Sequence, residues 1–192
     1  MKNKLVLAIL SLFGLGACTN DSEASGADDL GSAPVQPESF WEIIAEAKAS
    51  AAGDHEAYAK FLRAHLAEQT LEHIQQFDTQ FRELHNDANR WGLWGAAYIV
   101  NGGGGDDGFD FFRNWLISQG EKIYAAAIAN PDSLAEFDFV LDPGEGVSFE
   151  YLAYVAMEAY REKSGKEMPY PNATTMRDTQ GTPWEESDLA SI

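Results

Sequence analysis

Apolar side chains recur at three- and four-residue steps along most of this chain. The strongest stripe is made by Leu71, Ile74, Phe77, Phe81 and Leu84. This spacing places the side chains on one face of a helix and leaves the opposite face to polar residues. Sustained two-residue alternation, the pattern typical of strands, does not occur in the sequence. The pattern therefore predicts an all-α fold, a compact multi-helix domain of about six to eight helices.

Three polar residues mark where the first helices begin. Ser39, followed three residues later by Glu42, forms a capping box. Asp54 and Thr70 stand directly before the next two helical patterns. Side chains of these types accept hydrogen bonds from the backbone N–H groups that a helix start leaves unpaired. We therefore expect one helix to begin after each of the three capping residues.

Residues 91–100 are apolar on every face, and we expect this helix to be buried on most sides. Asn101 and the four glycines that follow it end the helix. The next helix is expected to begin near Asp107, with Asp110 at the third helical position, because carboxylates suit the positive end of a helix dipole. Gly120 is expected to end this helix.

Shorter patterns fill the remainder of the chain. The residues before Pro131 predict one short helix, and this proline begins another. A last long helix is expected from Ser148 to Gly165, after a turn at residues 143–146. Beyond it the chain is expected to be extended, with a short helix after the capping box at Thr182.

The first eighteen residues have the pattern of an export signal. Lys2 and Lys4 precede an apolar run over residues 5–13, which is too short to span a bilayer as a stable helix. Leu-Gly-Ala then leads to Cys18, the single cysteine of the chain. These four residues resemble the bacterial lipobox, whose cysteine is lipidated and becomes the new N-terminus. We predict a lipoprotein signal peptide over residues 1–17 and lipidation at Cys18; a plain secretory signal is the alternative.

Residues 18–37 carry small, polar and acidic side chains, without a basic residue or a large aromatic one. Such a segment buries too little apolar surface to fold, so we expect a disordered acidic linker. It would join the bilayer to a single helical domain over residues 38–192 with an extended C-terminal tail. The protein is thus expected in the cell envelope. By resemblance to lipoprotein sorting, Thr19 indicates the periplasmic face of the outer membrane in a cell with two membranes.

The chain is strongly acidic, with 31 Asp and Glu residues against 13 Lys and Arg and a formal net charge of −18. Loss of Lys2 and Lys4 with the signal takes this charge to −20. Such a surface repels nucleic acid, so we expect no nucleic-acid partner. It favours a cationic partner and raises the rate of encounter with it. Solubility alone is the other explanation of the charge.

Two long blocks stand in the centre of the chain, LWGAAYIVNGG at Leu93–Gly103 and DDGFDFFRNWL at Asp106–Leu116. They resemble a bacterial family known as domain of unknown function 4240. Further matches to that family are Phe40, Trp41 and Ile44 near the first helix start and Gly181, Trp184, Glu185 and Glu186 in the tail. The resemblance implies a small helical domain. It implies no established activity, so no catalytic residue is carried over.

Three carboxylates follow the glycine loop after Asn101, namely Asp106, Asp107 and Asp110. The simplest interpretation is that they stabilise the start of a helix. A divalent-cation site is the alternative, although their spacing differs from that of a Ca²⁺-binding loop. Asp106 and Asp107 are also catalytic candidates, since together with Glu145 they offer an acid and a base for a carboxylate-dependent hydrolase.

Aromatic residues are concentrated in the same region. Trp91, Trp94 and Trp115 are most simply core residues, and the alternative is an aromatic groove for a sugar or a peptide. Arg90 and Arg113 are expected to tie the fold together or to hold an anionic ligand. Their expected internal partners are Asp106, Asp107 and Glu121. The residues expected to contact a ligand or partner are Trp91, Trp94, Asn101, Asp106, Asp107, Asp110, Arg113 and Trp115.

The histidines of the chain are His55, His65, His73 and His85. They show neither an H-x-x-x-H nor an H-E-x-x-H spacing, so we expect each of them on a solvated helix face. The sequence predicts no metal site and no cofactor. No serine stands in a G-x-S-x-G motif, which leaves nucleophilic catalysis without a visible candidate.

These features favour a non-catalytic envelope lipoprotein that presents an acidic helical domain to a protein partner. An inhibitory or immunity-like role toward a basic enzyme or toxin fits the charge. The alternatives are a carboxylate-dependent cell-wall hydrolase and a small-ligand binding protein with a pocket lined by Trp91 and Trp94. The expected partners are the lipid bilayer, through Cys18, and a cationic envelope protein.

Overall fold

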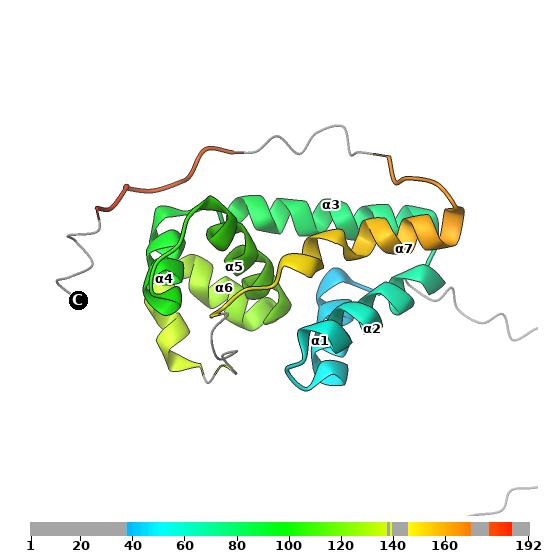
Figure 1. The fold of residues 1–192 in the computed structure, drawn as a ribbon, viewed down its shortest axis with the longest axis horizontal. Helices are drawn as coiled ribbons and strands as arrows, with labels where there is room; N and C mark the ends of the chain where they lie inside the picture. Colours follow the sequence, from blue (N-terminus) through cyan, green and yellow to red (C-terminus); the bar gives the residue numbers. More distant parts are fainter. Residues whose placement is uncertain (1–37, 138, 140–145, 170–176, 186–192) are drawn as a thin grey trace, which may run out of the picture. The chain divides into compact units, whose positions relative to one another are not determined.

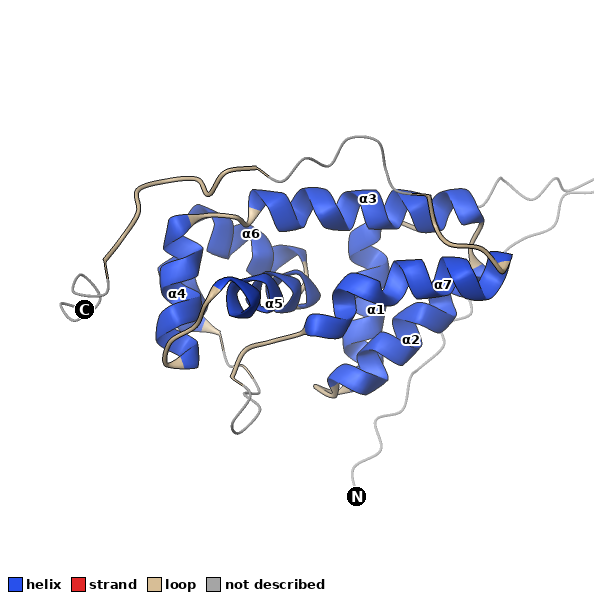
Figure 2. Cartoon of the chain, turned by 45° about the horizontal axis from the view of Figure 1, so that its top comes forward, coloured by secondary structure: helices blue, strands red, loops and turns tan. Residues whose placement is uncertain are grey.

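The computed structural model describes residues 38–137, 139, 146–169 and 177–185. Within these ranges the secondary structure is helical and holds no strand beyond one isolated bridge (Figures 1 and 2). The α-helices are α1 (Phe40–Ala51), α2 (His55–Glu68), α3 (Leu71–Asp87), α4 (Trp91–Asn101), α5 (Asp106–Ser118), α6 (Glu121–Ala129) and α7 (Val155–Ser164). Two 3₁₀ helices are η1 (Pro131–Glu136) and η2 (Glu150–Tyr154). The all-α prediction is confirmed.

The predicted signal peptide, the lipidation site Cys18 and the acidic linker lie outside the described residues. Most of the predicted turn at 143–146, including Glu145, also lies outside them. None of the helices in the described ranges is both long enough and apolar enough to cross a membrane.

The first three helices begin where the capping residues predict. The Ser39 hydroxyl accepts a hydrogen bond from the Glu42 amide, and the Glu42 carboxylate accepts one from the Ser39 amide at 2.8 Å. The bond from the Ser39 backbone, with a second from its hydroxyl, lowers the pKa of Glu42 because it stabilises the ionised form. Asp54 and Thr70 likewise accept from the amides three residues ahead of them. All three predicted starts are confirmed.

Helices α1, α2, α3 and α7 enclose one part of the core. α1 packs against α2, α2 against α7, and α7 against α3. Figure 1 shows α3 and α7 running side by side. Their contacts leave several large apolar side chains without exposed surface, namely Ile43, Ile44, Leu62, Leu66 and Ile74. Each side chain of this kind stabilises the fold by about 1.5–3 kcal/mol when it is buried.

Helix α5 lies at the centre of the other part of the core. It contacts α3, α4, α6 and η2, and the seven consecutive residues Phe112–Ser118 are all buried. The prediction that residues 91–100 are buried on most sides is wrong, since Ile99 is 54% exposed and Val100 43%. Much of α4 is glycine and alanine, which offers little side-chain area to bury. The larger side chains of α5 gain more from the central position.

The start of α5 differs from the prediction at its cap. Gly105, and not Asp107, is the N-cap residue, and no side chain caps the helix. Asp106 is already helical, so it and Asp107 act on α5 only through the negative charge they bring to the first turn. Asp110 lies beyond that turn rather than at the third helical position. The end is as predicted, because Gly120 follows the helix with a φ of 94° that favours glycine.

The last helix begins later than predicted. The Phe149 amide donates a hydrogen bond to the Phe111 carbonyl at 3.1 Å, which ties the chain to α5 just after Ser148. The 3₁₀ helix η2 follows this anchor, and regular α-helix begins only at Val155. Gly165 then ends α7 with a φ of 67°, as predicted.

Residues 177–185, which we call the C-terminal strap, run in extended form across the start of α4. The Gln180 carbonyl accepts a hydrogen bond from the Trp91 amide at 2.9 Å. The Arg177 guanidinium pairs with the Asp87 carboxylate at the end of α3. Figure 2 shows the strap as loop throughout.

Trp184 explains why the strap is not helical. Its indole N–H donates to the Trp91 carbonyl at 2.9 Å, and the ring lies against Gly95. A Cβ on Gly95 would come within 3.3 Å of Trp184 Nε1, so the glycine makes room for the indole. The helix predicted after Thr182 is therefore absent from the described residues 182–185, because this segment packs on α4 instead.

Candidate functional site

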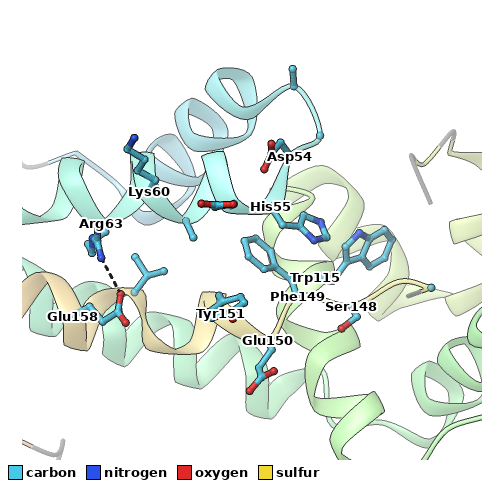
Figure 3. Close-up of a pocket in the computed structure, with 16 residues that line it drawn as sticks. Asp54, His55, Lys60, Arg63, Trp115, Ser148, Phe149, Glu150, Tyr151 and Glu158 are labelled. Atoms are coloured by element: carbon cyan, nitrogen blue, oxygen red, sulfur yellow. Dashed lines mark ion pairs between the residues drawn. The ribbon is translucent and has the colours of Figure 1, made fainter. Parts of the chain in front are cut away.

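A hollow of about 1200 Å³ opens between the start of α2 and the segment that leads into α7. Figure 3 shows it in close-up. One wall comes from residues 52–63, which form the α1–α2 turn and the first half of α2. The other wall comes from residues 146–158, and Trp115 of α5 also lines the hollow. We call it the α2–η2 groove.

His55 and Phe149 form the aromatic floor of the groove. Their rings stack with 4.4 Å between centroids and 8° between planes. Tyr58 meets Phe149 edge-on at 5.3 Å, and the ring of Trp115 is buried beside them. His55 is the first residue of α2, so the Asp54 cap that starts the helix also positions the imidazole. Within the described residues no hydrogen bond reaches the His55 ring nitrogens, which leaves both of them to a ligand.

Two exposed tyrosines stand beside this floor on η2. Tyr151 lines the groove and is 70% exposed, and Tyr154 is also exposed. Residues three apart in a 3₁₀ helix share one face, so both rings point to the same side. A large aromatic ring with its faces open to water is typical of a contact surface.

Carboxylates outnumber basic groups around the groove. The acidic residues of its lining are Asp54, Glu56, Glu150 and Glu158, and the basic ones are Lys60 and Arg63. The Arg63 guanidinium is held by Glu158 at 3.5 Å and by Glu162 at 3.7 Å. Figure 3 shows the Arg63–Glu158 ion pair, and it shows Lys60 pointing away from the aromatic floor. The field near the floor is therefore negative, which favours a cationic group.

Asn101, predicted as a ligand residue, holds one wall of the groove from the end of α4. Its Oδ1 accepts a hydrogen bond from the Val147 amide at 2.7 Å. The neighbouring Gly146 has a φ of 68°, and a Cβ there would lie 2.5 Å from the same oxygen. Both the conformation and the lack of space require glycine at this position. Asn101 is thus a positioning residue for the groove wall.

The α4–α5 block, residues 91–118, uses its aromatic side chains for packing. Trp91 stacks on Trp94 with centroids 5.2 Å apart, and Trp94 stacks on Phe109 at 4.9 Å. The Arg113 guanidinium lies over the Phe109 ring at 4.7 Å. Ring faces that were candidates for a sugar, peptide or small-ligand site therefore contact one another. Trp91 and Trp94 do not line the α2–η2 groove, whereas Trp115 does.

Arg113 forms the predicted internal tie, but with a different partner. Its guanidinium pairs with the Asp110 carboxylate and donates to the His85 carbonyl at 3.1 Å. Burial lowers the pKa of Arg113, and the Asp110 charge opposes this effect. Arg90 instead donates to the Asp87 carbonyl at 2.8 Å. The arginines therefore join α3 to α5 and brace the α3–α4 corner.

The other carboxylates predicted for this region do not come together with the arginines. Among the described residues, no ion pair involves Asp106, Asp107 or Glu121, so the predicted pairing with them is wrong. Asp106 and Asp107 are exposed at the first turn of α5 and do not line the groove. With Asp110 engaged by Arg113, the three aspartates also do not form a group of ligand spacing.

Two polar side chains of α3, His85 and Asp78, are more buried than the sequence predicted. His85 is half-buried; burial, together with the charge of Arg113, lowers its pKa to about 4. Asp78 is buried and accepts a hydrogen bond from Arg82 Nε at 2.6 Å. A signal for Asp78 existed in the sequence, because it lies four residues after Ile74 on the apolar face of α3.

The prediction that all four histidines occupy solvated helix faces is wrong, because each is half-buried and contacts other groups. His65 and His73 both reach Glu38 at the edge of the folded unit. His65 Nε2 lies 2.8 Å from the Glu38 carboxylate, and His73 Nε2 lies 3.0 Å from its carbonyl oxygen. Residues 27 and 35 positions apart share no local motif, so no spacing in the sequence indicates this cluster.

Residues 36–162 match the family model described as a protein of unknown function, DUF4240. The match covers more than half of the chain, which therefore belongs to the DUF4240 family. It includes both walls of the α2–η2 groove and the whole α4–α5 block, and it ends before the C-terminal strap. No curated protein and no solved structure matches the chain.

Proposed function

We propose that this DUF4240 protein is a lipid-anchored interaction module of the bacterial cell envelope. Its acidic helical domain binds a cationic segment of a partner protein in the α2–η2 groove. An inhibitory or immunity-like role toward a basic enzyme or toxin is the form of this function that the charge favours.

The observation that supports the proposal most directly is the exposed Tyr151 ring in an acidic groove. The face of a tyrosine ring attracts a Lys or Arg side chain by about 0.5–1 kcal/mol at an exposed site. Glu150 and Glu56 lie in the same lining and offer carboxylates to that cation. The open nitrogens of His55 add a polar contact at the floor. A basic side chain between these groups would gain all three interactions at once.

The anchor in this proposal is supported by the N-terminal pattern. Lipidation of Cys18 would attach the chain to the membrane, and residues 18–37 would act as a flexible spacer. A flexible segment of this length reaches about 25 Å on average, enough to hold the domain clear of the lipid headgroups. The expected location is the periplasmic face of the outer membrane in a cell with two membranes. Mass spectrometry of the mature N-terminus tests this, with Cys18→Ser expected to release the protein from the membrane fraction.

A capture experiment with matched charge changes tests the groove. The full-length protein, immobilised in detergent, is exposed to an envelope extract at low and at high salt. We expect salt-sensitive capture of a basic protein, weakened at least about tenfold by the pair Glu56→Gln and Glu150→Gln. The control pair Asp106→Asn and Asp107→Asn removes the same charge away from the groove.

The outcomes separate three conclusions. Loss of capture in the groove pair alone supports the proposal. Equal loss in both pairs would mean that net charge binds the partner and the groove does not. Failure to capture any basic protein at low ionic strength would remove the interaction function itself.

A carboxylate-dependent hydrolase is the alternative function. Its sequence candidates Asp106 and Asp107 stand exposed at a helix start and outside the groove. The same Asp106→Asn and Asp107→Asn pair tests it. An activity on cell-wall fragments that disappears in this pair, with helical content unchanged, would replace our proposal.

A further inference from the structure

Glu38, Glu46 and His65, none of which lines the α2–η2 groove, meet near the first described residue of the chain. His65 Nε2 lies 2.8 Å from the Glu38 carboxylate, and His65 Nδ1 lies 3.9 Å from that of Glu46. One ligand atom from each residue lies within 4.8 Å of the other two. From this geometry we infer that the three side chains form a binding site for a divalent transition-metal ion of the zinc class.

The distances are short enough for one ion to reach all three groups. Three atoms no more than 4.8 Å apart share a point at most about 2.8 Å from each, against about 2.0–2.2 Å for a zinc–ligand bond. Shifts of less than an ångström in the side chains close this difference. Glu46 has the freedom to make such a shift, because its side chain is 56% exposed.

The surrounding structure holds the ligands in place. Glu46 lies on α1 and His65 in the last turn of α2, and these two helices pack against each other. The Phe61 ring stacks on the His65 imidazole at 5.8 Å. His73 of α3 bonds to the Glu38 carbonyl at 3.0 Å and so fixes the backbone that carries the first ligand. Outer contacts of this kind orient metal ligands and raise affinity.

The chemistry of the donors selects the class of ion. One imidazole nitrogen with two carboxylates balances the charge of a divalent ion, and water completes a tetrahedral shell. Calcium and magnesium prefer shells made of oxygen alone, so the imidazole favours a transition metal. Bound metal would fasten the first described residues to α2.

Zinc titration of the full-length chain tests the inference. Isothermal titration calorimetry with zinc chloride on chelator-treated protein in detergent, at neutral pH, should show one zinc per chain. His65→Gln should weaken binding at least about tenfold, and Glu46→Gln should do so with the fold retained, since that side chain is exposed. The control His55→Gln makes the same chemical change outside the cluster and should leave zinc affinity unchanged.

Thermal unfolding supplies a second readout. Zinc should raise the unfolding midpoint of the wild-type chain by several degrees and leave that of Glu46→Gln nearly unchanged. Absence of zinc binding to the wild type would overturn the inference and leave the cluster as an ion pair only. Equal zinc affinity in the wild type and in both cluster variants would overturn it as well, by placing the ion elsewhere.

Discussion

The α4–α5 block and the α2–η2 groove are both built from aromatic and charged side chains, but they use them in opposite ways. In the block, Trp91, Trp94 and Phe109 stack face to face and Arg113 lies over the last ring. In the groove, the stacked His55 and Phe149 rings form a floor, and the Tyr151 ring beside it is exposed to water.

This difference indicates where the fold leaves side chains accessible to a ligand. A side chain whose faces and polar atoms are all in contact with neighbours contributes to stability, whatever its type. A side chain that keeps a free face or a free nitrogen remains able to bind. The block is richer in aromatic residues, but the groove presents Tyr151, which is 70% exposed, beside the His55 ring nitrogens, to which no hydrogen bond is made within the described residues. The groove is therefore the better place to look for function.

The two regions should differ most in how much the free energy of unfolding falls when a side chain is truncated, and the larger fall is expected in the block. Phe112 is fully buried on α5, and Phe112→Ala should lower the free energy of unfolding by about 3–5 kcal/mol. Tyr151→Ala in the groove is the control and should change it by no more than about 0.5 kcal/mol. Urea unfolding followed by circular dichroism measures both. Similar losses in the two variants would contradict the difference between the block and the groove.

His85 is expected to have a smaller effect on the free energy of unfolding, and this effect depends on pH. Burial lowers the pKa of His85 from 6.5 to about 4, so the unfolded chain takes up a proton before the folded chain does. The contribution of neutral His85 to the free energy of unfolding is therefore fully present above about pH 6.5 and is lost as pH falls toward 4. Allowing for the partial exposure of the ring, the loss is on the order of 2 kcal/mol.

The variant His85→Gln removes this titration while keeping a polar side chain. Unfolding free energies measured between pH 7 and pH 4 should fall less steeply in the variant than in the wild type. Parallel pH profiles for the two proteins would show that His85 does not carry the effect.

The smallest effect is expected at Asn101, which connects the two regions. Asn101→Ala removes the acceptor for the Val147 amide and should cost about 1 kcal/mol, with faster hydrogen exchange at that amide. Asn101→Asp keeps an oxygen at this position and should restore slow exchange. If the alanine variant leaves exchange at Val147 unchanged, Asn101 does not hold the groove wall.

Much of the helical fold could be predicted from local signals. Ser39, Asp54 and Thr70 begin their helices as predicted because a cap interacts with atoms only a few residues away. The same locality explains Gly120 and Gly165, whose positive φ values end their helices. The start of α7 was predicted less well, since Phe149 is anchored by Phe111 from a distant part of the chain.

The candidate site could not be predicted in the same way. Its floor joins His55 to Phe149, and its wall depends on Asn101 at the end of α4. These pairs are formed by packing between helices, and no spacing in the sequence encodes them. The sequence favoured residues in the long aromatic and acidic blocks as ligand contacts. In the fold, most of these side chains pack against or pair with other residues of the chain.

The sequence by itself determined the helical class, most helix ends and the strongly negative charge, because periodicity, capping and composition act locally or additively. Only the tertiary structure decided that α5 and not α4 is central, that the Trp91 and Trp94 rings stack on each other, and that Tyr151 is exposed beside the groove floor. Burial of a given side chain depends on which distant surfaces pack against it. Which surfaces pack together depends on the sum of all contacts in the folded unit.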